Sequence, residues 1–255
     1  MIRPLACLIV IGLMAAASLA DVPPSDTDTP DIAASGVTST APPDLTAGFV
    51  RLSDHAPQIR LDIRYATAEN FVGAPVPGYS GAECILTRAA ADALVNADKS
   101  LRSQGFALVV HDCTRPLRAV AHLTTWVATG PDAPLWHPDI PRRDLITRGY
   151  IAARSGHARG STVDAGLIRP GDANPRAPNT RCDRTTEAVD MGTPFDCFSP
   201  RSGAAARITP QARKNRAILT AAMTAAGFKG YAREWWHFRL SPEPFPDTEF
   251  DFEIK

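Results

Sequence analysis

Apolar residues recur at helical spacing in three stretches of the chain, each bounded by residues that start or stop helices. The predicted helices cover residues 87–103, 116–130 and 209–227. Thr87 and Thr209 can each cap the first turn of a helix, and Pro116 suits the first helical position. A glycine stands at or just beyond the end of each pattern, which favours termination there.

Shorter apolar runs between these helices have the length and composition of strands. We predict strands at Phe106–His111, at Val163–Ile168 and at the centre of the aromatic run Tyr231–Leu240. Helices and strands follow one another irregularly, without the alternation that is typical of a doubly wound parallel sheet. The pattern therefore predicts an α+β fold. No break or repeat interrupts the chain beyond Gly48, which favours a single domain.

The N-terminal residues have the pattern of a targeting segment. Arg3 supplies a positive charge, Leu5–Leu19 is a nearly unbroken apolar run, and small residues near Ala20 suit cleavage. An uncleaved membrane anchor is the alternative, although the run is shorter than the roughly 20 apolar residues of a bilayer span. The next segment is rich in Pro, Ser, Thr, Asp and Ala, which is typical of a flexible linker. We therefore expect a signal peptide at 1–20, a linker at 21–46 and the domain at 47–255, without stable membrane insertion after cleavage.

Four cysteines remain once the leader with Cys7 is removed, and an even number suits an oxidising compartment. Four cysteines allow three pairings, and the sequence cannot choose among them rigorously. We expect Cys182 to pair with Cys197 and Cys84 to pair with Cys113. A closed loop of about 15 residues is worth roughly 3 kcal/mol. A four-thiolate zinc site is the weaker alternative, because the chain has no Cys-x-x-Cys pair.

The number and distribution of charged residues argue against some classes of partner. The chain has 27 Lys and Arg residues and 27 Asp and Glu residues, so its formal net charge is zero. The basic residues are scattered rather than gathered in a stripe, which argues against nucleic acid or an anionic membrane as partner. A small substrate, recognised locally, fits this balance better. The oligomeric state does not follow from the sequence.

The first segment with unusual chemistry runs from Ser155 to Asp164. It places an imidazole, His157, seven residues before the carboxylate of Asp164. The glycines and serines between them permit a tight turn before the strand at Val163–Ile168. The two side chains converge on one ion if the chain turns once between them. A hydrogen-bonded loop pair is the competing interpretation for this segment alone.

The second segment is the aromatic run, where Glu234 precedes His237 by three residues. In an extended strand His237 faces one side, and Glu234 lies at the entering end. A metallohydrolase needs such a pair, with one group on the metal and the other beside the attacking water. A core histidine packed between tryptophans is the alternative. The remaining histidines have no partner ligand at useful spacing, and we expect structural or surface roles for His55, His111, His122 and His137.

Together the two segments contain two imidazoles and a carboxylate, the three-ligand set of a catalytic zinc site with one open position. The pattern Ser-x-His-x-x-Gly-x-x-x-Asp, followed far downstream by Glu-x-Trp-His, resembles the D-alanyl-D-alanine dipeptidases, zinc peptidases related to D,D-carboxypeptidases. The resemblance covers Leu52 to Lys255. It includes further matching segments at residues 65–67, 70–71, 78–79, 112–116, 191–192, 195–196 and 243–252. It implies one compact domain with a small central antiparallel sheet flanked by helices, as in D,D-peptidases and hedgehog-type domains.

The resemblance also implies a role for individual residues. One zinc ion per chain is held by His157, Asp164 and His237. Glu234 takes a proton from the attacking water and delivers it to the leaving amine, and Arg115 stabilises the oxyanion.

On the substrate side, Asp196 pairs with the free ammonium of the dipeptide, and Tyr65, Tyr79 and Ser155 line the pocket. The residues alone favour a turn for Asp196, and they favour packing as much as binding for the two tyrosines and the serine. One departure from the family lies at Cys113-Thr114, where relatives carry a small residue and an aromatic one. It indicates either a shift of the arginine that follows or a disulfide.

We expect hydrolysis of a small D,D-dipeptide, above all D-Ala-D-Ala, in the periplasm or outside the cell. An exported enzyme meets cell-wall turnover products, which favours salvage over glycopeptide resistance. One alternative is a D,D-carboxypeptidase that trims peptidoglycan stem peptides. Another is a non-catalytic zinc-binding module of the hedgehog type, which has no need of Glu234 or Arg115.

Overall fold

The computed structural model describes residues 37–39, 48–172, 182 and 189–255. These residues belong to one compact unit, Ala34–Lys255. The predicted leader, residues 1–20, lies outside the described residues, as does most of the predicted linker. Within the linker, Val37–Ser39 form a strand that pairs in parallel with Thr248–Phe250. No helix in the described ranges is both long and apolar enough to cross a membrane.

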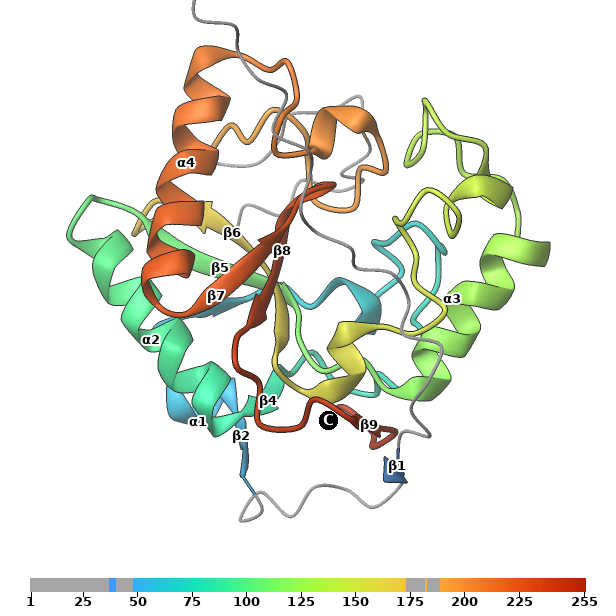
Figure 1. The fold of residues 1–255 in the computed structure, drawn as a ribbon, viewed down its shortest axis with the longest axis horizontal. Coiled ribbons are helices and arrows are strands. Elements are labelled where there is room, and N and C mark those ends of the chain that lie inside the picture. Colours follow the sequence, from blue (N-terminus) through green and yellow to red (C-terminus); the bar gives the residue numbers. More distant parts are fainter. Residues whose placement is uncertain (1–36, 40–47, 173–181, 183–188) are drawn as a thin grey trace, which may run out of the picture. The chain divides into compact units, whose positions relative to one another are not determined.

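The elements mix helices and strands irregularly, as the sequence pattern predicts (Figure 1). The helices are α1 (Leu52–His55), α2 (Arg88–Arg102), α3 (Leu117–Thr129) and α4 (Pro210–Ala225). The strands are β1 (Val37–Ser39), β2 (Phe49–Arg51), β3 (Arg60–Leu61), β4 (Ile85–Thr87), β5 (Ala107–Asp112), β6 (Thr162–Ile168), β7 (Phe228–Tyr231), β8 (Glu234–Leu240) and β9 (Thr248–Phe250). Short 3-10 turns are η1 (Arg64–Ala66), η2 (Arg142–Asp144), η3 (Gly156–Arg159) and η4 (Pro200–Ser202).

The three long helices form where capping and periodicity predict them. The Thr87 hydroxyl accepts a hydrogen bond from the amide of Ala90, and the Thr209 hydroxyl accepts one from Ala212, so each satisfies an otherwise unpaired amide of the first turn. The start of α3 differs from the prediction. Pro116 precedes α3 as its N-cap, and the helix begins at Leu117.

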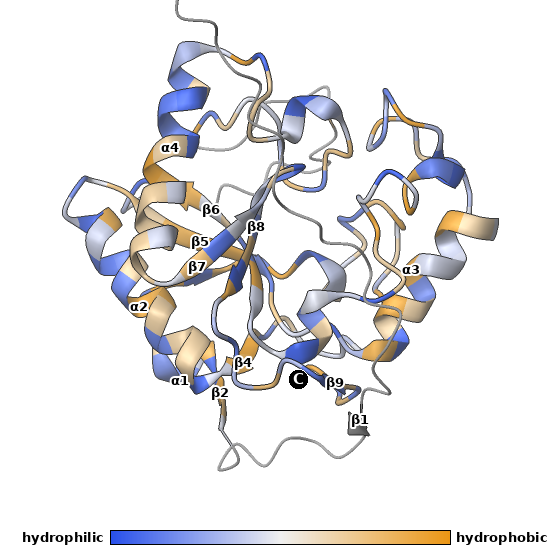
Figure 2. Cartoon of the chain, viewed as in Figure 1, coloured by the Kyte–Doolittle hydropathy of each residue, from blue (hydrophilic) through white to orange (hydrophobic). Residues whose placement is uncertain are grey.

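The main sheet has the strand order β3-β5-β6-β8-β7. Strands β5, β6, β8 and β7 pair antiparallel, as predicted for the centre, whereas the short edge strand β3 runs parallel to β5. Helix α2 packs against β5, and α4 packs against β6, β7 and β8. Figure 2 shows hydrophobic residues gathered where α2 meets the sheet and hydrophilic ones on the outer turns of α2 and α4.

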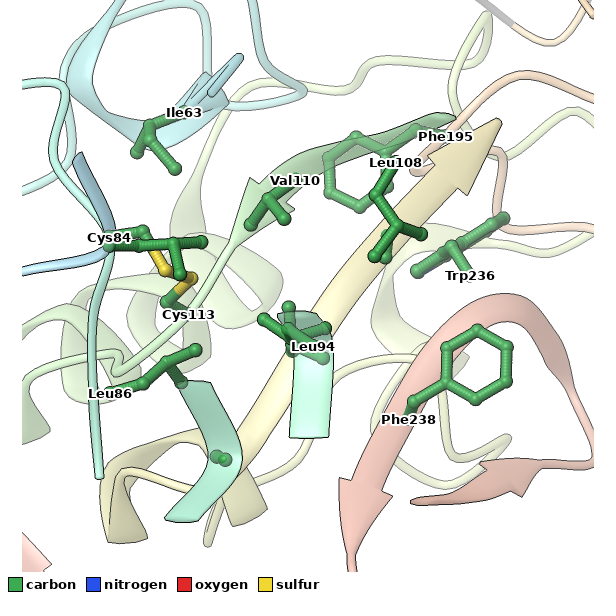
Figure 3. Close-up of a cluster of buried hydrophobic side chains, with 14 of the residues drawn as sticks. Ile63, Cys84, Leu86, Leu94, Leu108, Val110, Cys113, Phe195, Trp236 and Phe238 are labelled. Atoms are coloured by element: carbon green, nitrogen blue, oxygen red, sulfur yellow. A yellow bond between two sulfur atoms is a disulfide. The ribbon is translucent and has the colours of Figure 1, made fainter. Parts of the chain in front are cut away.

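The core between helices and sheet is built from fully buried large side chains, among them Leu94, Trp236 and Phe238 (Figure 3). The two disulfides join Cys84 to Cys113 and Cys182 to Cys197, which confirms the expected pairing. Figure 3 shows the first disulfide among the buried side chains of this core. Trp236 and Phe238 point into this core, so His237 between them, with its partner Asp164 on β6, lies on the other face of the sheet.

Candidate metal centre and active site

Two neighbouring strands bring a carboxylate and an imidazole together. Strands β6 and β8 pair so that Asp164 lies directly opposite His237. Side chains at paired positions point to the same face of a sheet. The Nδ1 atom of His237 is accordingly 3.1 Å from Oδ1 of Asp164. The alternate residues of β8, Trp236 and Phe238, are buried in the core and fix which face His237 takes.

The third residue comes from the turn before β6. His157 lies in η3, where the Ser155 hydroxyl accepts a hydrogen bond from the His157 amide. Gly160 then adopts a φ of 80°, a left-handed conformation that glycine reaches without strain, and the chain reverses into β6. This single turn places Nε2 of His157 3.2 Å from Nδ1 of His237 and 3.4 Å from Oδ1 of Asp164.

These three atoms have the spacing that a tetrahedral metal ion requires. Ligand atoms about 2.0 Å from a tetrahedral centre lie about 3.3 Å from one another. The Nδ1 atom of His157 donates to the carbonyl of Cys113 at 2.7 Å, which turns Nε2 toward the other two groups. Two imidazoles and a carboxylate are a donor set suited to zinc. His157, Asp164 and His237 therefore form a group able to hold a metal ion.

The electrostatics at Asp164 and His237 favour the protonation states in which these two residues bind a metal ion. Burial alone would raise the pKa of Asp164, but His157 and His237 hold it well below its ordinary value. Burial lowers the pKa of His237, opposed by the hydrogen bond to Asp164. An ionised carboxylate and neutral imidazoles are the forms that bind metal ions.

Glu234 stands beside this group at the start of β8. Its Oε2 atom is 3.9 Å from Nδ1 of His237, and the residue is 7% exposed. Burial raises its pKa well above the ordinary value, with further contributions from Asp164 and Asp196. A carboxyl group of raised pKa at this position is suited to accept a proton and to return it.

Arg115 borders the group from the segment between β5 and α3. Its Nη2 atom is 3.6 Å from Oδ2 of Asp164 and 2.9 Å from Oδ2 of Asp112. Asp112 is fully buried and also accepts a hydrogen bond from the Tyr79 hydroxyl at 2.6 Å. Asp112 is not among the residues to which the sequence pattern gives a role. Its position three residues before the arginine in a turn was the available signal.

Of the remaining predicted residues, Tyr65 contacts Arg115 directly, and Tyr79 reaches it through Asp112. The guanidinium stacks over the ring of Tyr65, whose hydroxyl donates to Asp196 at 3.1 Å. Asp196 is buried and has a φ of 58°, the only positive φ of a non-glycine residue in the described part of the chain. Burial and the charge of Asp164 raise its pKa. Ser155, by contrast, directs its hydroxyl to the backbone of η3 as described above.

A family model described as D-ala-D-ala dipeptidase, Peptidase_M15, matches residues 45–255. The chain belongs to this D-ala-D-ala dipeptidase family. The D-alanyl-D-alanine dipeptidase of Enterococcus faecium is 37% identical over 213 residues, 82% of this chain and 98% of the relative. The D-alanyl-D-alanine dipeptidase of Streptomyces coelicolor is 39% identical over 214 residues, 82% of this chain and all of the relative. That of Escherichia coli is 32% identical over 196 residues, 76% of this chain and 86% of the relative.

In this member of the D-ala-D-ala dipeptidase family, the site gathers four buried carboxylates around one guanidinium. They belong to Asp112, Asp164, Asp196 and Glu234. Buried carboxylates repel one another, and burial penalises their charged forms unless cations compensate them. A divalent metal ion beside Asp164 and a cationic group beside Asp196 would supply that compensation. The charge distribution of the site thus fits a metal ion and an ammonium.

Proposed function

We propose that this chain is an exported zinc dipeptidase that hydrolyses D-alanyl-D-alanine and similar small D,D-dipeptides. The observation that carries the proposal is the convergence of His157, Asp164 and His237, with Glu234 beside them and Arg115 at their edge. Membership of the D-ala-D-ala dipeptidase family supports the substrate.

His157, Asp164 and His237 would hold one zinc ion per chain. When bound, zinc supplies Lewis-acid chemistry, which lowers the pKa of water toward neutrality and polarises a carbonyl group. The carbonyl of Cys113 keeps the His157 ring in place, and His237 on the neighbouring strand holds Asp164. A site supported in this way loses little free energy in ordering its side chains when it binds the metal.

Glu234 would transfer the proton, and Arg115 would stabilise the negative charge on the carbonyl oxygen. Glu234 accepts a proton from the attacking water while the oxygen of that water bonds to the scissile carbonyl carbon. When the carbon–nitrogen bond breaks, the same carboxyl returns the proton to the leaving amine, and two D-alanine molecules result. Arg115 offers guanidinium hydrogens to the negative charge that develops on the carbonyl oxygen, which is worth on the order of 10²-fold or more in rate.

Asp196 would select the length of the substrate. Its carboxylate pairs with the free ammonium of a dipeptide, and the Tyr65 hydroxyl holds the carboxylate in position. A stem peptide has an amide at that point and gains no such ion pair. Tyr79 and Ser155 would complete the lining of the site.

The decisive measurement is D-alanine release by the purified protein, with zinc content determined on the same sample. We expect about one zinc per chain and faster release from D-Ala-D-Ala than from a pentapeptide stem. Faster release from the stem would establish the carboxypeptidase alternative instead. Stoichiometric zinc without release from either substrate would favour a binding module.

Export is part of the same proposal. Residues 1–20 would be removed as a signal peptide, 21–46 would form a linker, and 47–255 the catalytic domain. The two disulfides support an oxidising compartment, the periplasm or the exterior, and there the substrate would come from cell-wall turnover. The mass of the protein recovered from the periplasm tests this. A mass that retains residues 1–20 would contradict cleavage.

A further inference from the structure

The disulfide Cys84–Cys113 joins segments that flank strands of two different sheets, since β4 pairs with β2 and β5 belongs to the main sheet. Cys84 directly precedes β4, and Cys113 directly follows β5, 29 residues later. Both are buried, at 0% and 2% exposure (Figure 3). The link continues at Thr114, whose amide and hydroxyl both donate to the carbonyl of Ile85, at 3.2 and 2.5 Å. Strand β4 and the segment after β5 are thus held covalently and by two hydrogen bonds.

The segment tied down in this way contacts a proposed metal ligand. The Cys113 carbonyl accepts the hydrogen bond from Nδ1 of His157 at 2.7 Å. In return the His157 carbonyl accepts a hydrogen bond from the amide of Arg115 at 3.2 Å. The orientation of the imidazole and the path of the backbone at Arg115 therefore depend on where Cys113 stands.

Strand β4 also reaches the other side of His157. The amide of Thr87 donates to the carbonyl of Gly160 at 2.8 Å, and the hydroxyls of Thr87 and Ser161 are 2.8 Å apart. Gly160 and Ser161 form the turn between His157 and β6. Strand β4 consequently bonds to both segments that frame the proposed metal site, and the disulfide is the covalent part of this attachment.

We propose that the Cys84–Cys113 pair is a positioning element of the active site, which holds the imidazole of His157 and the guanidinium of Arg115 for metal binding and catalysis. The catalytic half rests on the proposed function. The metal-binding half rests only on the proposed zinc site at His157, Asp164 and His237, and not on the hydrolysis of a dipeptide. Loss of an outer partner of a metal-ligating histidine weakens metal binding by about 10- to 100-fold. The Cys113→Ala substitution keeps the backbone carbonyl, so the loss arises only if the segment that carries this carbonyl moves away from His157 once the disulfide is gone.

The test compares two variants that each lose one disulfide. The double variant Cys84→Ala/Cys113→Ala should bind zinc at least about 10-fold more weakly, measured by competition with a chelating dye. The absorption spectrum of its Co²⁺ form should change, and kcat at saturating zinc should fall. Both variants should have a lower melting temperature, because each loses a disulfide. The matched control Cys182→Ala/Cys197→Ala should nevertheless keep the zinc affinity within twofold and leave the Co²⁺ spectrum unchanged.

A folded Cys84→Ala/Cys113→Ala protein with unchanged zinc affinity and unchanged Co²⁺ spectrum would overturn the proposal. Where that variant does not fold, Thr114→Val in the oxidised chain takes its place, because it removes one hydrogen bond to Ile85 and leaves both disulfides. We expect zinc binding about threefold weaker in that variant, and unchanged binding would count against the proposal. A protein that binds zinc as expected but never releases D-alanine refutes the proposed function alone.

Discussion

Arg216 on α4 holds the segment that carries Asp196. It is 6% exposed, and its guanidinium donates to the carbonyls of Met191 at 2.7 Å, Gly203 at 2.9 Å and Arg201 at 2.9 Å. One of these carbonyls precedes Asp196 in the sequence and the other two follow it. The Arg216 side chain therefore holds both ends of the loop that carries Asp196. We predict that Arg216→Met lowers both stability and substrate affinity.

The magnitude follows from the three short hydrogen bonds. Each hydrogen bond to a charged group contributes about 1.5 kcal/mol or more, and methionine leaves the carbonyls without that donor. We therefore expect the free energy of unfolding to fall by about 4–5 kcal/mol. For a domain of this size that corresponds to a melting temperature lower by roughly 10 °C. KM should rise because Asp196 loses its fixed position, whereas zinc affinity should not change.

Urea denaturation and steady-state kinetics with D-Ala-D-Ala measure both effects. Arg213→Met is the matched control, since Arg213 is exposed on the same helix, and its stability should change by no more than about 0.5 kcal/mol. A loss of less than about 1 kcal/mol in Arg216→Met, together with the wild-type KM, would contradict this role of Arg216.

Three further predictions concern charge, proton transfer and the metal. Asp62 is buried against Arg64 at 2.7 Å and His111 at 3.5 Å, so Asp62→Asn should cost about 3–5 kcal/mol at neutral pH in urea denaturation. Burial would raise the pKa of Asp62, but His111 and Arg64 hold it well below its ordinary value; the stabilisation is therefore complete above about pH 4 and is lost on further acidification. The difference in the free energy of unfolding between the wild type and Asp62→Asn should therefore become smaller toward pH 3. A difference that stays constant with pH would contradict the ion pairing of Asp62. Glu234→Gln should retain zinc but release D-alanine at least about 10²-fold more slowly, and near-normal turnover would exclude Glu234 as the proton carrier. Removal of zinc with a chelator should lower the melting temperature, since zinc at 1,000 times its Kd stabilises by about 4 kcal/mol, and His157→Ala should abolish that difference.

Local features of the chain were predictable because local interactions decide them. The caps at Thr87 and Thr209 act within three residues, and the apolar periodicity of α2 and α4 needs only one face to be covered. The resemblance to the family indicated His157, Asp164 and His237 as metal ligands, because that resemblance rests on residue types and spacings that are visible in the sequence. The helix at Pro116 was predicted one residue too early, within the ordinary uncertainty of a helix end.

The tertiary structure decided which distant residues meet. Asp164 and His237 are 73 residues apart and face one another only because β6 and β8 pair in one register, and a shift by one residue would turn His237 to the opposite face. The same holds for Asp112, whose bonds to Arg115 and Tyr79 depend on how β5 ends beside a separate loop. Strand pairing and buried polar networks depend on the packing of the whole core, which local patterns along the chain do not encode.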